Sequence, residues 1–97
     1  MLHLVFQSSL GPELLQRFDT DDAVVFLENS VLRLMQNSYC ANALSQRLAK
    51  VRFYALAQDL ATRGIIADEI IPGIQIIDYA ALVKLSIDYT PIQSWFC

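Results

Sequence analysis

The stretch that most constrains the fold is residues 50–85, where strand-like and helix-like runs alternate. Residues 51–55 are apolar apart from one arginine, and β-branched and aromatic at their start, which predicts a buried strand. Helix formers fill residues 56–63, and Gly64 stands where a left-handed residue would end a helix. The first half of this stretch therefore predicts a strand followed by a helix.

The second half repeats the pattern. Residues 73–77 form another apolar run, and Asp78 is well placed to cap a helix that starts at Tyr79 and fades near Asp88. Strand, helix, strand and helix within so short a stretch predict parallel strands joined by a right-handed crossover.

The remaining chain carries an earlier version of the same alternation. Apolar runs at residues 2–6 and 23–27 predict two more buried strands. A helix is expected at residues 12–18, and a second helix, interrupted at residues 36–38, is expected at residues 31–35 and 39–48. Residues 92–97 are expected to form an aromatic tail after Pro91. Four strands alternating with four helices predict an α/β fold, a three-layer α/β/α sandwich around a parallel sheet of about four strands, in a single domain spanning residues 1–97. In such sheets the loops that follow the strands, here beginning at Gln7, Glu28, Leu56 and Asp78, are where ligands usually bind.

The composition is unusually apolar for so small a chain. Hydrophobic residues make up 55% of the 97 residues, and the mean hydropathy is +0.38. A small domain has too much surface to bury so many apolar side chains, so we expect another chain to cover part of it. No apolar run reaches the roughly 18 residues of a membrane span, and the first residues lack the pattern of a signal peptide. We therefore expect no membrane association, a cytoplasmic location and reduced thiols.

The net charge of −3 does not favour binding to nucleic acid, and no direct contact is expected. Residues 30–67 nevertheless hold five bases and one acid. A solvated helix surface explains this better than a basic face, although RNA contact through Arg47 and Arg52 stays an alternative hypothesis.

The sequence offers no complete catalytic, cofactor or metal site. Gly11 is expected to serve a turn, and no glycine-rich phosphate loop is present, so we expect no cofactor. His3, the only histidine, lies near the start of a strand and is expected to be structural rather than a catalytic base. Asp19, Asp21 and Asp22 lack the spacing of a calcium loop and are expected to form a solvated turn, so no metal is expected.

The thiols and the aromatic tail are the remaining candidates. Cys40 would lie in the first turn of the helix at residues 39–48, where a thiolate is favoured, but its apolar neighbours favour burial, so it is a weak candidate thiol. Cys97 is expected to be incidental. Trp95 and Phe96 either dock onto their own domain or fill a pocket in a partner, and they are our candidates for an interface.

An ordered set of short motifs resembles one known family. The set comprises Met1-Leu2-His3, Tyr54-Ala55-Leu56, Asp59-Leu60, Arg63-Gly64, Ile77-Asp78-Tyr79, Val83-Lys84-Leu85 and the ending Gln93-x-Trp95. Together they resemble the TusB/DsrH family over nearly the whole chain. Where that family usually has Gln-Asp-Gly after the second strand, this chain departs from the pattern with Glu28-Asn29-Ser30.

The resemblance implies a DsrE-like fold and a non-catalytic subunit of a heterohexamer with TusC-like and TusD-like chains, which relays persulfide sulfur toward thiolation of the tRNA wobble uridine. The relation to tRNA would be indirect, and the TusD-like chain would carry the sulfur. A DsrH-like role in sulfur oxidation is an alternative, although DsrH-like chains carry a cysteine in the first helical region and this chain has none between Gly11 and Asp22. A second alternative is that the chain itself is a sulfurtransferase that uses Cys40.

Overall fold

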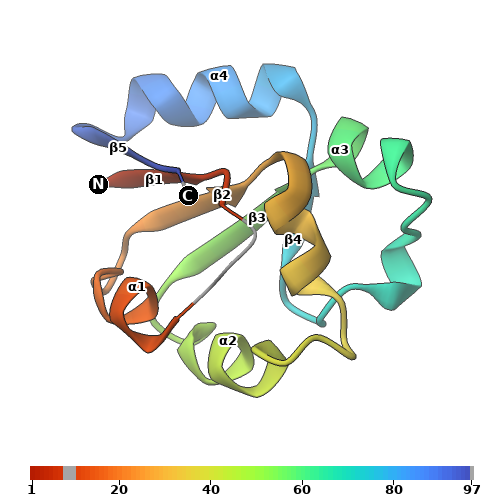
Figure 1. Ribbon diagram of the computed structural model, residues 1–97. Helices are drawn as coiled ribbons and strands as arrows, with labels where there is room; N and C mark the ends of the chain where they lie inside the picture. The colour runs from red at the N-terminus through yellow and green to blue at the C-terminus, as the bar shows by residue number, and fades with distance from the viewer. Residues whose placement is uncertain (8–10, 97) are drawn as a thin grey trace.

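Five parallel strands form one sheet in a computed structural model that describes residues 1–7 and 11–96. The strands lie in the order β4-β3-β2-β1-β5 (Figure 1). They are β1 (Leu2–Val5), β2 (Ala23–Phe26), β3 (Arg52–Leu56), β4 (Gln75–Ile77) and β5 (Ile92–Trp95). Every pair of neighbours is parallel, as expected from the alternating sequence pattern.

Helices cover both faces of the sheet, but unequally. The helical elements are α1 (Pro12–Gln16), the 3₁₀ helix η1 (Glu28–Leu34), α2 (Ala41–Arg47), α3 (Ala57–Thr62), the 3₁₀ turn η2 (Ala67–Glu69) and α4 (Tyr79–Asp88). Figure 1 shows α4 above the sheet and α1 and α2 below it. The expected three-layer α/β/α sandwich is confirmed, and one of its outer layers consists of α4 alone.

Alternating side chains of the strands feed two separate cores. In β2, Val24 and Phe26 point into the larger core, which also holds residues of α1, η1, α2 and α3. Ala23 and Val25 point to the other face, where they form a smaller core that only partly buried residues of α4 help to cover. Because β2 is apolar on both faces, it occupies the centre of the sheet, as a doubly covered strand requires.

The segment after Pro91, expected to be an aromatic tail, is instead the fifth strand of the sheet. Ile92 lies opposite Leu2 and Trp95 lies opposite Val5 in the ladder with β1. Pro91 contributes its carbonyl, which accepts from the Leu2 N–H at 3.0 Å. A proline at the start of a strand needs no N–H for the ladder, so it does not prevent pairing at the edge.

Several local signals in the sequence act as predicted. Gly64 follows α3 with φ of +69°, and Asp78 caps α4 by accepting a hydrogen bond from the Ala81 N–H at 2.9 Å. The segment after β2 differs from the prediction: it is a 3₁₀ helix that begins at Glu28. The next helix begins at Ala41, so Cys40 is its N-cap residue rather than part of its first turn.

The order of the strands places a switch in chain direction between β1 and β5. From β1 the chain winds outward through β2, β3 and β4, and then α4 returns it across the other face to β5 on the far side of β1. Open parallel sheets usually bind ligands outside the carboxyl ends of their strands at such a point. Within residues 1–7 and 11–96, no helix combines the length and the apolar character that a membrane crossing requires.

Candidate functional site

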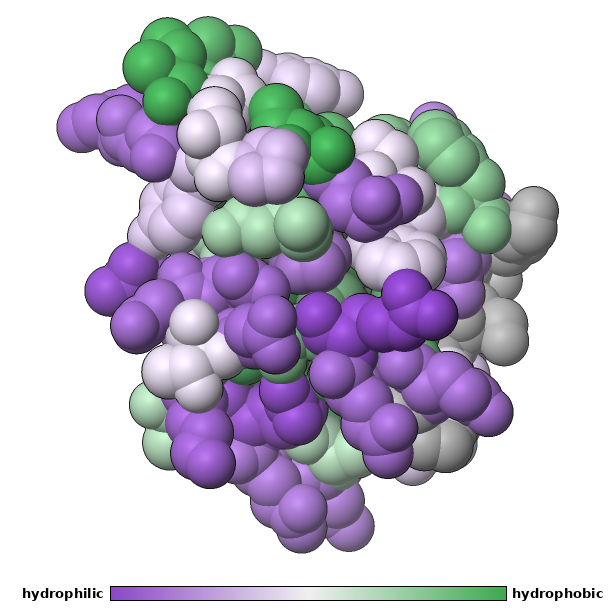
Figure 2. All heavy atoms as spheres, turned by 90° about the vertical axis from the view of Figure 1, so that its left-hand side faces the viewer, coloured by the Kyte–Doolittle hydropathy of each residue, from purple (hydrophilic) through white to green (hydrophobic). Residues whose placement is uncertain are grey.

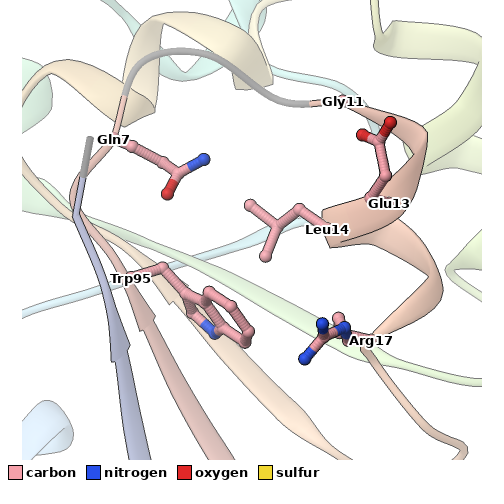
Figure 3. A pocket seen from close by; sticks show the side chains of 6 residues that line it. All are labelled: Gln7, Gly11, Glu13, Leu14, Arg17 and Trp95. Atoms are coloured by element: carbon pink, nitrogen blue, oxygen red, sulfur yellow. The ribbon is translucent and has the colours of Figure 1, made fainter.

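A cavity of about 340 Å³ lies at this switch point. Its lining comes from the end of β1, from α1 and from β5, and consists of Gln7, Gly11, Glu13, Leu14, Arg17 and Trp95. Figure 3 shows the Trp95 indole on one side, Leu14 projecting from α1 toward it, and the Gln7 side chain turned toward the same space. The cavity thus stands where the topology alone places a ligand site.

The charged groups of the cavity lie at different ends. The Arg17 guanidinium carbon is 5.7 Å from the centre of the Trp95 ring, a distance typical of a cation–π contact. Across the described residues, no carboxylate forms an ion pair with Arg17. In Figure 3 the carboxylate of Glu13 points away from Trp95, so the wall formed by Arg17 and Trp95 is positively charged.

Trp95 is held in place by a buried histidine. Its indole N–H donates to Nδ1 of His3 at 3.0 Å, and His3 is only 2% exposed. Because Nδ1 accepts this bond, Nε2 carries the imidazole proton and donates to Oδ2 of Asp22 at 2.9 Å. The two bonds fix both the tautomer of His3 and the orientation of the indole.

Asp22 anchors the other end of this chain of hydrogen bonds. Its Oδ2 also accepts from the Asp19 N–H at 2.9 Å, and its Oδ1 lies 3.1 Å from the ammonium group of Met1. Burial raises the pKa of Asp22, but the hydrogen bonds from Asp19 and His3 and the charge of the ammonium group outweigh it, so the pKa lies below its ordinary value of 3.8. Asp22 is therefore a carboxylate at neutral pH.

The prediction of a solvated turn was wrong for Asp22, which is buried. Asp22 immediately precedes β2, and Ala23 lies opposite Leu2, so the pairing of β1 with β2 brings the carboxylate to the side of His3. The sequence signal for this pair was a histidine in the first predicted strand and an aspartate just before the second. His3 is buried as expected of a structural residue, with its ring 4.8 Å from that of Phe18.

The structure does not bring Cys40 to the cavity. Its side chain is 5% exposed, and Sγ lies 3.1 Å from the Ser38 hydroxyl and 3.4 Å from the Arg33 carbonyl. A thiol in this setting needs local opening before it can meet another protein. Cys97 lies outside the described residues.

Arg47 and Arg52, the two arginines considered for RNA contact, do not share one face of the molecule. Arg47 lies on α2 and donates to the Phe18 carbonyl, whereas Arg52 donates to the Tyr89 hydroxyl at 2.5 Å just after α4. These helices cover opposite faces of the sheet (Figure 1), so the two arginines do not form a common patch for RNA. No group of three or more potential metal ligands occurs in the part of the chain that the structure describes.

The loop at Glu28-Asn29-Ser30 has an unusual backbone. Glu28 has φ of +55°, a region that side chains other than glycine and asparagine rarely adopt. Its N–H donates to Oδ2 of Asp59 at 2.7 Å, while the buried Ser30 hydroxyl lies 2.6 Å from the Val5 carbonyl and 2.7 Å from that of Leu27. These contacts hold the loop against the ends of β1 and α3.

Apolar side chains remain exposed on the α4 side of the sheet. We call this the α4–β5 surface, and it comprises Tyr79, Val83, Ile87, Ile92 and Phe96. Phe96 stacks on Phe6 with ring centres 4.7 Å apart and is still 68% exposed. Figure 2 shows strongly apolar side chains at the top of the molecule, where α4 lies, above a largely hydrophilic lower part. The role of Trp95 and Phe96 in an interface stays a prediction.

Comparison with known proteins assigns the chain to a family. A family model described as DsrH-like protein matches residues 5–91. The chain belongs to the DsrH-like family. Protein TusB of Buchnera aphidicola subsp. Baizongia pistaciae (strain Bp) is 32% identical over 98 residues, covering 98% of this chain and 100% of the relative. Membership in the TusB/DsrH family supports a role as a subunit in sulfur relay.

A solved structure supports the fold of this DsrH-like chain. The protein of unknown function MTH1491 from Methanobacterium thermoautotrophicum superimposes with a TM-score of 0.80, covering 97% of this chain and 96% of that one. Its sequence is 16% identical, so the likeness shows the shared fold alone.

Proposed function

We propose that this DsrH-like chain is a non-catalytic structural and interaction subunit of a cytoplasmic sulfur-relay complex, with TusC-like and TusD-like chains as its partners. The complex would act in 2-thiolation of the tRNA wobble uridine, and this chain would relate to tRNA only indirectly. The observation that carries the proposal, beside family membership, is the α4–β5 surface.

Helix α4 is covered on one side only. None of its ten residues is buried, and Tyr79, Val83 and Ile87 are 53%, 58% and 73% exposed. Four-residue spacing places these three side chains along one face of the helix, away from the side that meets the sheet. A continuous exposed apolar stripe is typical of a surface that another protein covers.

The position of the thiol supports a structural role. Cys40 is buried beneath the end of η1 and the start of α2, and no cysteine is among the described residues that line the cavity. In the complex, the sulfur carrier would therefore be a cysteine of a partner subunit. The alternative in which Cys40 carries sulfur requires the start of α2 to open.

Co-expression with TusC-like and TusD-like chains tests the proposal. The wild-type chain should elute with both partners in gel filtration, whereas Ile87→Lys should leave the complex because a lysine would be buried against an apolar partner. Ile66→Lys is the matched control, since Ile66 is also exposed, at 61%, but lies before η2. Thermal melts of the isolated variants check that both fold.

The proposal fails if the wild-type chain binds neither partner and elutes as a stable monomer. If Ile87→Lys assembles as well as Ile66→Lys does, the α4–β5 surface is not where the partners bind.

A further inference from the structure

The side chain that holds Trp95 in place is itself titratable, because the indole N–H donates to the imidazole of the buried His3. We propose that His3 is a pH-sensitive switch: the neutral imidazole holds the indole beside β1, and the protonated imidazole releases it. The switch consists of residues of this chain alone, so it operates with or without the proposed partners. Only a proton is gained or lost, and no other bond changes.

Both ring nitrogens of His3 are occupied when the imidazole is neutral. Nδ1 accepts from the Trp95 N–H at 3.0 Å, and Nε2 donates to Oδ2 of Asp22 at 2.9 Å. A second proton can bind only to Nδ1, because Nε2 already carries one. The imidazolium would then direct its new N–H at the indole N–H, and two donors cannot share a hydrogen bond. Protonation of His3 and its contact with Trp95 are therefore mutually exclusive.

The charged groups around His3 come from four segments. Asp22 faces Nε2 from the position before β2, and its pKa lies below the ordinary value of 3.8, so a carboxylate stays opposite the ring in mild acid. Three cations are more distant: the Met1 ammonium group bonds to the other oxygen of Asp22, Arg17 at the end of α1 lies over the indole, and Arg47 on α2 donates to a carbonyl just after α1. Among the described residues, only Asp22 forms an ion pair with the imidazole. The imidazolium therefore keeps a partner when it loses the indole.

The released indole has space beside it. Trp95 forms one wall of the cavity of about 340 Å³ at the switch point, and Leu14 projects toward it from α1 (Figure 3). The backbone of Trp95 is held separately, since its carbonyl accepts from the Phe6 N–H at 3.0 Å. The ring can therefore rotate while β5 stays paired with β1. Protonation of His3 would move a wall of the cavity without unfolding the sheet.

His3 and Trp95 are the only histidine and the only tryptophan in the chain, so each gives a single set of ring resonances in NMR spectra. The full chain is titrated from about pH 8 to about pH 5, the range in which histidine ordinarily changes its charge. As the His3 nitrogens change to the imidazolium pattern, the indole N–H resonance should move upfield and exchange faster with water, with the same midpoint. Circular dichroism over the same range checks that the chain stays folded.

Two substitutions separate this switch from other sources of pH dependence. His3→Gln has no second proton to gain, so its indole resonance should stay constant, whereas a transition caused by the Met1 ammonium group would persist. Trp95→Phe removes the donor to Nδ1, so His3 should become protonated at a higher pH than in the wild-type chain, because the indole no longer competes with the proton. Phe96→Leu is the matched control: it alters the next aromatic side chain, which stacks on Phe6, and should leave that pH unchanged.

Several results would overturn the proposal. The indole resonance could stay unchanged while His3 becomes protonated, or its transition could persist in His3→Gln. His3 could also remain neutral until the chain unfolds. If His3→Gln does not fold, the comparison of the wild type with Trp95→Phe decides: protonation of His3 at the same pH in both chains means that the proton and the indole do not compete.

Discussion

Replacing Asp22 with asparagine removes one charge from the centre of the buried network while keeping the shape of the side chain. Asp22 accepts hydrogen bonds from the Asp19 N–H and from His3 on one oxygen and faces the Met1 ammonium with the other. An asparagine that keeps its oxygen toward His3 turns its amide N–H₂ toward the ammonium group. The opposite orientation loses the hydrogen bonds that Oδ2 accepts from the Asp19 N–H and from His3, so neither orientation of the asparagine amide satisfies the site.

The expected loss is about 2 kcal/mol of the free energy of unfolding at neutral pH, since a buried hydrogen bond to a charged group contributes roughly 1.5–3 kcal/mol. For a domain of this size, that corresponds to a decrease in Tm of about 8–16 °C. Asp19→Asn is the control, because the Asp19 carboxylate is exposed and contributes only its backbone N–H to the network.

The effect should depend on pH in a defined direction. The folded pKa of Asp22 lies below the ordinary value of 3.8, so its stabilisation is present above about pH 4 and is lost as the pH falls through the folded pKa. Urea unfolding followed by Trp95 fluorescence should therefore show a gap between wild type and Asp22→Asn at pH 7 that narrows steadily below pH 4. A gap of equal size at pH 7 and pH 3, or no gap at pH 7, would refute the reasoning.

Two further substitutions test neighbouring parts of the structure. Trp95→Phe removes the donor to Nδ1 of His3 and should lower the free energy of unfolding, followed by circular dichroism, by about 1–3 kcal/mol, because a buried acceptor is left without a partner. A loss no larger than that of an exposed substitution such as Phe96→Leu would contradict this. Ser30→Ala removes a buried hydroxyl that lies between the Val5 and Leu27 carbonyls and should lower the free energy of unfolding in urea titrations by about 1 kcal/mol. Ser86→Ala on the exposed face of α4 is the control, and equal effects at the two serines would count against the loop anchoring.

The alternation of apolar runs was sufficient to predict the central sheet. Residues 23–27 are apolar throughout, and the structure buries Ala23 to Phe26 completely in β2. Single residues likewise predicted the end of α3 and the start of α4: Gly64 follows α3 with a positive φ, and Asp78 caps the first turn of α4. These features depend on residues close together in the chain, which is why sequence reading finds them.

The fifth strand escaped prediction because its evidence is not local. Ile92-Gln93-Ser94-Trp95 is short and follows a proline, and only the vacant side of β1 makes it a strand. The cavity shares this cause, since its walls on α1 and β5 are separated by most of the chain. Asp22 was missed for the same reason: its partner His3 lies 19 residues away and is brought near only by strand pairing.

Strand β5 connects the α4–β5 surface with the cavity at the switch point. Because side chains alternate along a strand, Trp95 points toward α1 and the cavity, while Ile92 and Phe96 point to the α4 side. A partner that covers the α4–β5 surface would therefore contact the strand whose opposite face forms the cavity wall. Since the His3 network fixes Trp95 independently of that surface, Ile87→Lys should abolish assembly and leave the intrinsic fluorescence of Trp95 in the isolated chain unchanged.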